Sequence, residues 1–152
     1  LTGGAGDDVF ITAVEGASEA VTAVTAGDID ANTVFTFDDG VDVITDFVAA
    51  DDTIARDATA DTAAAAINSL LGALNTLNDP NDIYLVYGTW DSAAGTFTDA
   101  TDTFNAGTAN DALVVFGETG TALTQANTTG YTVLENLGAA VTTADFLATT
   151  AT

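Results

Sequence analysis

The chain opens with the stretch that decides its fold: residues 1–11 read Leu1-Thr2-Gly3-Gly4-Ala5-Gly6-Asp7-Asp8-Val9-Phe10-Ile11. Glycine allows tight turns and a close approach of the backbone to other groups. Asp8 then supplies a carboxylate, and Phe10 is expected to point inward from the short strand that follows the turn. The stretch therefore predicts a glycine-lined turn that carries an acidic group to the start of a strand.

Residues 3–11 fit the nonapeptide G-G-x-G-x-D-x-U-x, which is typical of calcium-binding parallel β-rolls, at every specified position. In such rolls an ion lies between successive turns, so a single copy needs a partner elsewhere in the chain. The G-x-D-x-U core of Gly6, Asp8 and Phe10 recurs 34 residues later at Gly40, Asp42 and Ile44. We expect the two copies to form the halves of one calcium site. The alternative for residues 40–44 is an ordinary turn that enters a strand.

The length of 152 residues is suited to a single domain with one core. Within it we distinguish the end of a β-roll over residues 1–57 and a cap over residues 58–152. Because 34 is not a multiple of nine, the roll must contain an insertion, which we place at residues 12–37. The insertion contains β-prone stretches at residues 20–25 and 33–37 and an acidic turn at Asp28 and Asp30.

The cap is predicted to begin with an amphipathic helix at about residues 61–77, with Asp61 as its N-cap and Asn78-Asp79-Pro80 as its end. Its apolar stripe is expected to cover a sheet. Strands are predicted at residues 83–88, 96–98, 112–116 and 131–134, with a turn through Asp91 and Gly95. The fold class is therefore mainly β, a short calcium roll followed by an antiparallel, sandwich-like cap with one helix. The stripe consists of Ile67, Leu70, Leu71, Leu74 and Leu77.

The charge of the chain is strongly unbalanced, with 23 acidic residues against one basic residue, Arg56, and a net charge of −22. Carboxylates at close range repel one another, and salt or bound divalent cations weaken this repulsion. Calcium is the natural counterion because it prefers carboxylate and carbonyl oxygens. A solvated acidic surface adapted to high salt is the alternative. Nucleic acid is excluded as a partner because no basic patch exists. Membrane insertion is not expected, because no apolar run approaches the roughly 20 residues that a spanning helix needs.

Catalysis is not expected. The chain has no histidine or cysteine, and acid–base chemistry would rest on a pair of carboxylates that nothing in the sequence singles out. Tyr84, Tyr87 and Trp90 could form a platform for a carbohydrate, but alternation over residues 83–90 is better explained by a half-buried strand.

Taken together, these motifs resemble those of the RTX proteins of Gram-negative bacteria. The nonapeptide is the first match. The second is the run from Asp42 through Asp46 to Phe47, followed by Asp51-Asp52-Thr53-Ile54, which is similar to the D-x-I-x-D-F…D-x-I segment that commonly closes the calcium roll. Weaker matches at residues 82–86, 111–116 and 143–147 resemble the cap and secretion-signal region. The chain departs from the family in having one clear repeat instead of an array, and in its insertion.

The resemblance implies that Asp8, Asp42 and Asp46 ligate Ca²⁺, with Asp52 as a further candidate. The carbonyls of Gly4 and Gly6 would contribute, and Gly40 would begin the second half of the site. The resemblance also implies export, unfolded, by type I secretion machinery through an uncleaved C-terminal signal. The chain would then fold outside the cell or at its surface, where calcium at about millimolar concentration fills weak sites.

The function that follows from the resemblance is a non-catalytic, calcium-dependent folding and secretion module. The alternative is a self-assembling subunit of a surface layer, an adhesin or an extracellular filament, with contacts bridged by calcium. For self-association, uncharged segments such as residues 113–116 could pair between chains if they lie at a sheet edge, but they could equally be central strands.

Overall fold

The computed structural model describes residues 1–13, 33–37, 41–57, 66–69, 82–101, 103–116 and 131–147. Within these residues the chain is mainly β, as predicted, with one short 3-10 helix, η1 (Thr143–Asp145). One sheet has three strands, in the order β1 (Val9–Ala13), β4 (Thr53–Asp57) and β10 (Phe146–Leu147). The other is a curled mixed sheet of seven strands: β2 (Val34–Thr36), β7 (Thr96–Thr101), β6 (Asp82–Asp91), β8 (Asp111–Phe116), β9 (Tyr131–Leu134) and β3 (Asp42–Ile44) in order, with β5 (Ala66–Ser69) paired to β6.

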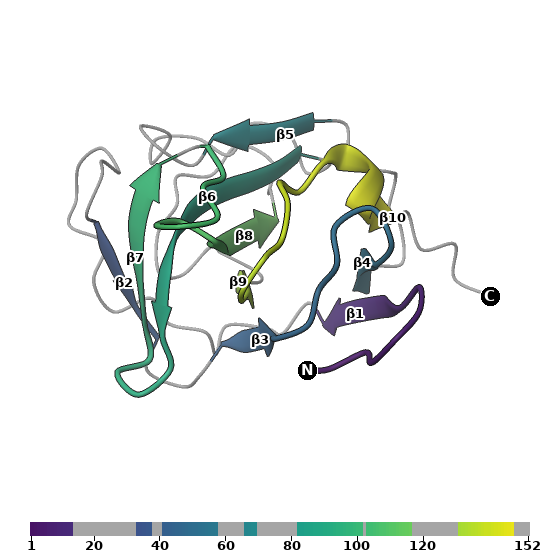
Figure 1. Cartoon of the computed structure of the whole chain (residues 1–152), viewed down its shortest axis with the longest axis horizontal. Helices are drawn as coiled ribbons and strands as arrows, with labels where there is room; N and C mark the ends of the chain where they lie inside the picture. The colour runs from purple at the N-terminus through teal and green to yellow at the C-terminus, as the bar shows by residue number, and fades with distance from the viewer. Residues whose placement is uncertain are drawn as a thin grey trace.

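Three segments far apart in the sequence lie side by side and run in the same direction (Figure 1). We call residues 1–13 the first layer, residues 41–57 the second and residues 131–147 the third. In the three-stranded sheet, β4 lies between β1 and β10 and is parallel to both. In the larger sheet, β3 is parallel to β9. The layers are thus stacked in sequence order, and each carries backbone from one sheet, through a turn, into the other.

Leu1 extends this stacking to the start of the chain. Its carbonyl accepts a hydrogen bond from Thr45 N at 3.1 Å, and its amino group donates to the carbonyl of Val43. These two bonds place Leu1 beside Ile44 in parallel register. The first layer therefore contacts the second at both of its ends.

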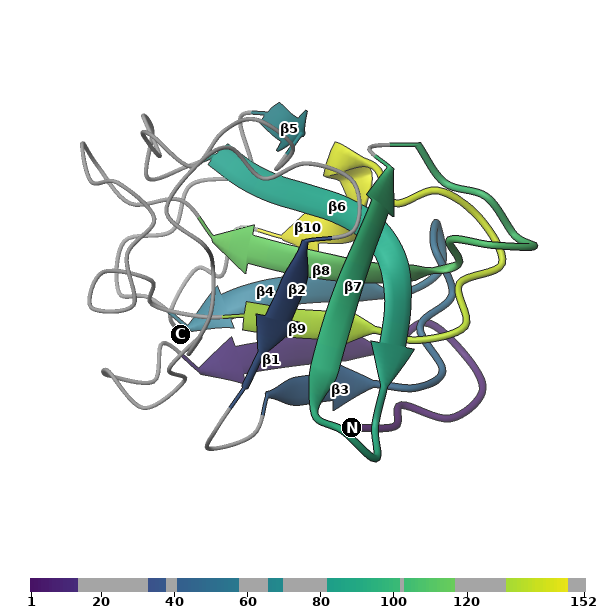
Figure 2. The same ribbon diagram turned by 90° about the vertical axis from the view of Figure 1, so that its left-hand side faces the viewer.

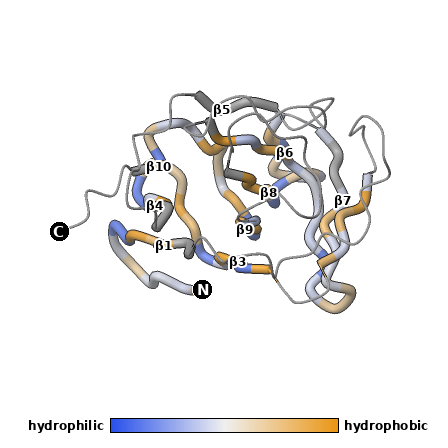
Figure 3. The backbone as a smooth tube through the Cα atoms, turned by 180° about the vertical axis from the view of Figure 1, so that it is seen from behind, coloured by the Kyte–Doolittle hydropathy of each residue, from blue (hydrophilic) through white to orange (hydrophobic). Residues whose placement is uncertain are grey.

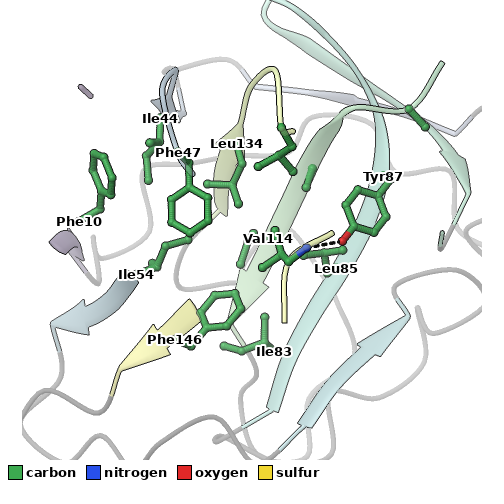
Figure 4. Packing of buried hydrophobic residues seen from close by; sticks show 14 residues of the cluster. Phe10, Ile44, Phe47, Ile54, Ile83, Leu85, Tyr87, Val114, Leu134 and Phe146 are labelled. Atoms are coloured by element: carbon green, nitrogen blue, oxygen red, sulfur yellow. Dashed lines mark hydrogen bonds between the residues drawn. The ribbon is translucent and has the colours of Figure 1, made fainter. Parts of the chain in front are cut away.

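Apolar side chains are stacked in register between the layers (Figure 4). Phe10 is paired with Ile54, and Ile54 with Phe146, and all three are buried. Ile44 and Leu134 form an equivalent pair in the other sheet. Because successive residues of a strand point to opposite faces, each layer delivers its inward residue to the same core. The expectation that Phe10 points inward is confirmed.

The centre of the larger sheet is buried on both faces. In β6, Ile83, Leu85 and Tyr87 enter the core shared with the three-stranded sheet. Tyr84 and Val86 enter a second core on the opposite face, which also contains residues of β2 and β7. Figure 2 shows β2 and β7 crossing in front of β8 and β9. The predicted half-buried strand at residues 83–90 is therefore wrong over residues 83–88, whose uninterrupted apolar run is typical of a strand covered on both sides.

The predicted helix at residues 61–77 is contradicted where it can be compared with the structure. Residues 66–69 form β5, which is parallel to β6 and pairs Ala66 with Asp82 and Ser69 with Leu85. Helix propensity is a weak prior that sheet pairing overrides, and β6 offers its backbone hydrogen bonds along this edge. The remaining residues of the predicted helix, Asp61 among them, lie outside the described residues. Over the described part of the chain, no helix is long and apolar enough to cross a membrane.

The strands predicted at residues 83–88, 96–98, 112–116 and 131–134 correspond to β6, β7, β8 and β9. The β-prone stretch at residues 33–37 contains β2, which is antiparallel to β7. Residues 113–116 belong to β8, a central strand between β6 and β9, so the alternative of a free edge there is wrong. Residues 20–25, Asp28 and Asp30 lie outside the described residues.

Candidate functional site

The glycine turn of the first layer lies against the turn of the second. Gly3 N and Gly4 N donate hydrogen bonds to the two carboxylate oxygens of Asp46, at 3.1 Å to Oδ1 and 3.0 Å to Oδ2. Gly4 and Gly6 have φ values of 105° and 126°, in the region that favours glycine. The structure thus brings together the glycine turn and Asp46, two parts of the site predicted from the sequence.

Asp52 connects the same two layers at the start of their strands. Its Oδ1 accepts a hydrogen bond from Asp8 N at 3.0 Å, and its Oδ2 accepts one from Val48 N at 2.8 Å. Thr53 N in turn donates to the carbonyl of Asp8 at 2.9 Å. The side chain of Asp52 is only 3% exposed. Its carboxylate is therefore committed to backbone donors from both layers.

The strand register shows which residues of the two layers correspond. Val9 is paired with Thr53, a separation of 53 − 9 = 44 residues instead of the expected 34. Asp52 therefore occupies in the second layer the position that Asp8 has in the first. Asp42 lies in β3, opposite Thr132, and is not the counterpart of Asp8. Gly40 lies outside the described residues.

A sequence signal for this register exists but is obscured by one substitution. Gly6-Asp7-Asp8-Val9-Phe10 corresponds to Ala50-Asp51-Asp52-Thr53-Ile54, so an alanine stands where the first layer has a glycine. Ala50 nevertheless adopts a φ of 78°, the left-handed region that glycine enters without strain. In both layers a pair of aspartates precedes a strand, and this shared pattern could have shown the correspondence. The absence of glycine at position 50 obscured it.

The carboxylate of Asp8 has a buried oxygen without a partner. Its Oδ2 is shielded from solvent and has no hydrogen-bond donor. It lies over Gly3, where any Cβ atom added to the glycine would approach Oδ2 to 2.5 Å. A buried anionic oxygen is costly unless a cation or a donor compensates it. Its chemistry fits a hard cation such as Ca²⁺, which prefers oxygen ligands.

The carboxylates alone do not form a complete coordination sphere. Among the residues that the structure describes, no group of three or more acidic side chains is placed so that it could hold a metal ion. Asp46 and Asp52 are engaged by backbone amides. An ion at Asp8 would therefore need carbonyl oxygens of the glycine turn, those of Gly4 and Gly6 being the predicted ones, to complete its ligands.

Two further buried aspartates make the same kind of backbone contact, and sequence reasoning missed this role. Asp145, 1% exposed, accepts hydrogen bonds from Ala50 N at 2.7 Å and from Thr142 N at 2.6 Å, which joins the second layer to the third. Asp111 accepts from Trp90 N at 2.7 Å and from Asn136 N at 2.8 Å. The spacing of Thr142 and Asp145 matches a capping box, which was the available signal.

The aromatic residues of β6 serve packing. Tyr84 and Tyr87 are buried, and Trp90 meets Phe37 edge-on with ring centroids 6.1 Å apart. The hydroxyl of Tyr87 accepts a hydrogen bond from Val141 N at 2.9 Å (Figure 4), and burial raises the pKa of this phenol. Two of the three residues considered for a carbohydrate platform therefore face the cores.

Comparison with protein-family models, with curated proteins and with solved structures gives no match.

Proposed function

We propose that this chain is a non-catalytic, calcium-dependent folding module of a secreted protein of the RTX type. The observation that carries the proposal is the partnerless, buried Oδ2 of Asp8, which lies between a glycine turn and a neighbouring parallel layer. A cation at this oxygen would compensate its charge and connect the first layer more firmly to the rest of the fold.

The charge of the chain supports the same proposal. A net charge of −22 opposes compaction, and one basic residue cannot offset it. Because an ion that binds only the folded chain adds its binding free energy to folding, calcium would stabilise the layers where it is abundant. In a calcium-poor cytosol the chain would stay loosely folded, and it would become compact outside the cell.

The export part of the proposal has a different basis. It rests on the resemblance of residues 143–147 to the secretion-signal region of RTX proteins. These residues form η1 and β10, which complete the third layer. Type I secretion machinery is the proposed partner during export, and the cell surface or the medium is the proposed destination.

A titration with chelator and calcium tests the folding role. We expect excess EGTA to reduce the β signal in circular dichroism and the cooperativity of thermal unfolding, and calcium to restore both. Asp8→Asn keeps the shape of the side chain but removes its charge, so it should raise the calcium midpoint at least about tenfold. Asp91→Asn is the matched control, because Asp91 is exposed at the end of β6 and accepts from Ala93 N and Ala94 N of the following turn. Complete folding in excess chelator, with a melting temperature that calcium does not change, would contradict the proposal.

The second candidate function is a self-assembling structural subunit whose acidic surfaces are bridged by calcium. The observation that favours it is the position of β1 at the edge of the three-stranded sheet. Light scattering and electron microscopy separate the two functions. A chain that folds with calcium and stays a small soluble species favours the folding module. Calcium-driven sheets or fibres with a regular repeat favour the structural subunit.

A further inference from the structure

The first layer has an open outer edge. Within the described residues, β1 has β4 as its only strand partner. Asp8 directs its N–H and its C=O toward the second layer. Because these directions alternate along a parallel strand, the backbone groups of Val9, Ile11 and Ala13 face the open side. Such a row of backbone donors and acceptors is a template for another strand.

The side chains on this edge are apolar and exposed. Val9 and Ile11 are 56% and 60% exposed, whereas Phe10 between them is 7% exposed. Leu1 in the same layer is also exposed. Figure 3 shows the apolar residues of β1 at the boundary of the fold. Three of the five large hydrophobic residues that are exposed in the described structure therefore belong to the first layer.

The charge of the chain indicates which partner suits this edge. Two copies with 23 acidic residues each repel one another at most contacts, but β1, which reads Val-Phe-Ile-Thr-Ala, has no charged residue. Of the other edge strands in the described structure, β5 has four residues, β2 and β3 have three each, and β10 has two. Among the described strands, the longest uncharged edge of one copy is thus best matched by the same edge of a second copy, where no carboxylate lies opposite another within the paired strands.

We propose that β1 pairs with β1 of a second copy in antiparallel register across a two-fold axis at Ile11. In this register Ile11 faces its own counterpart and Val9 faces residue 13 of the other copy. All three residues direct their backbone groups outward, so each facing pair exchanges two backbone hydrogen bonds. The two three-stranded sheets become one continuous sheet, and Val9 and Ile11 gain cross-strand neighbours.

The contact itself contains no calcium ligand, because it uses backbone groups and uncharged side chains; calcium at Asp8 affects the dimer only through the folding of the first layer. It does depend on ionic strength. Two chains of net charge −22 repel each other, and the range of that repulsion falls from about 30 Å at 0.01 M salt to about 3 Å at 1 M. The contact is short, so a weak dimer is expected.

Sedimentation velocity over a concentration series tests the pairing in low and in high salt, with calcium and with EGTA. We expect the dimer fraction to rise with protein concentration and with monovalent salt. Ile11→Lys and Ile11→Glu should each reduce the dimer at least tenfold, because each puts like charges opposite one another on the axis. An equal mixture of the two variants should restore a heterodimer, because a lysine then faces a glutamate. Val34→Lys is the matched control, since Val34 is exposed on β2, the edge of the other sheet.

Four outcomes would overturn the proposal. The first is a chain that stays monomeric at about 1 mM in 1 M salt. The second is an unchanged dimer in both Ile11 variants. The third is loss of the dimer in Val34→Lys, which would place the contact on β2. The fourth is two monomeric Ile11 variants that do not recombine, although circular dichroism shows both folded. If the dimer persists in EGTA while the calcium titration shows no effect on folding, the pairing stands and the proposed folding function fails.

Discussion

Buried aspartates in this chain obtain their compensation from the backbone. Asp52, Asp111 and Asp145 each accept hydrogen bonds from at least two amide groups. Hydrogen bonds to a charged acceptor are stronger than those between neutral groups. The amides that they satisfy belong to turns and to strand ends, which have no ladder partner for them. Asp8 differs because one of its oxygens has no such donor, and this difference distinguishes a candidate ligand from a structural carboxylate.

Replacing Asp52 by asparagine tests this distinction. The amide of the new side chain would direct N–H groups at either Asp8 N or Val48 N, so one backbone donor would lose its acceptor. We expect a loss of about 2–3 kcal/mol in the free energy of unfolding, measured by urea denaturation at saturating calcium. Asp91→Asn, at the exposed end of β6, should cost less than about 1 kcal/mol. Equal costs for the two variants would mean that Asp52 contributes no more than a surface acceptor.

Tyr87 makes the stability of the fold sensitive to alkaline pH. Burial raises its pKa above the ordinary value of 10.0, chiefly because the phenolate would be desolvated. A group with a raised folded pKa contributes stability that is present below its unfolded pKa and is lost as the pH rises through its folded pKa. The melting temperature should therefore fall above about pH 10. In Tyr87→Phe this fall should be shallower, although the variant starts from a lower stability because Val141 N loses its acceptor. An identical slope in both proteins would exclude Tyr87 as the cause.

At the level of strands and turns, the sequence was informative where a pattern was local. Residues 83–88 and 112–116 are continuous apolar runs, and both form central strands. The turn at residues 3–8 was recognisable from its glycines. The strand at residues 66–69 was not, because its pairing with β6 depends on neighbours distant in space, whereas its local spacing also suits a helix.

The register of the layers was missed for a similar reason. The nonapeptide was readable in the first layer, and Asp46 was correctly expected beside it. The counterpart of Asp8 was misplaced, because Ala50 stands where the pattern requires glycine and because residues 40–44 match the G-x-D-x-U core more closely. A motif search scores the identity of each residue, whereas the backbone at the position of Gly6 and Ala50 requires only a residue that tolerates a positive φ.

Ala50 provides a prediction at this scale. Its left-handed conformation costs an alanine roughly 1–2 kcal/mol, and glycine avoids that cost while losing about 0.5–1 kcal/mol through its greater freedom when unfolded. Ala50→Gly should therefore leave stability unchanged or raise it by up to about 1.5 kcal/mol. Ala49→Gly, at a neighbouring position without a positive φ, should lower it by about 0.5–1 kcal/mol. Urea denaturation of both variants measures the difference, and a loss in Ala50→Gly as large as that in Ala49→Gly would contradict the assignment of Ala50 to the position of Gly6.

For the whole molecule, the stacked layers pair short strands that are far apart in the sequence. The first layer contacts the second across 44 residues, and β4 contacts β10 across 92, as the pairing of Ile54 with Phe146 shows (146 − 54 = 92). The chain must lose the entropy of closing such loops before the contacts between the layers can stabilise it, and this makes folding slow. A net charge of −22 adds repulsion to that cost. Folding of this chain is therefore expected to respond strongly to anything that neutralises charge between the layers.

Two kinds of neutralisation can be separated by experiment. Screening by monovalent salt acts on all exposed carboxylates alike, so the melting temperature should rise gradually between about 0.01 M and 1 M sodium chloride. An ion bound at Asp8 acts at far lower concentration, and Ca²⁺ should act more strongly than Mg²⁺, which demands octahedral geometry and dehydrates reluctantly. At fixed ionic strength we expect calcium to raise the melting temperature at about millimolar concentration, and magnesium to need several-fold more. In Asp8→Asn the response to calcium should approach that to magnesium, while the response to sodium chloride stays unchanged. If calcium and magnesium act alike on the unaltered chain, its acidic residues form a screened surface without a specific site, and the partnerless, buried oxygen of Asp8 binds no calcium.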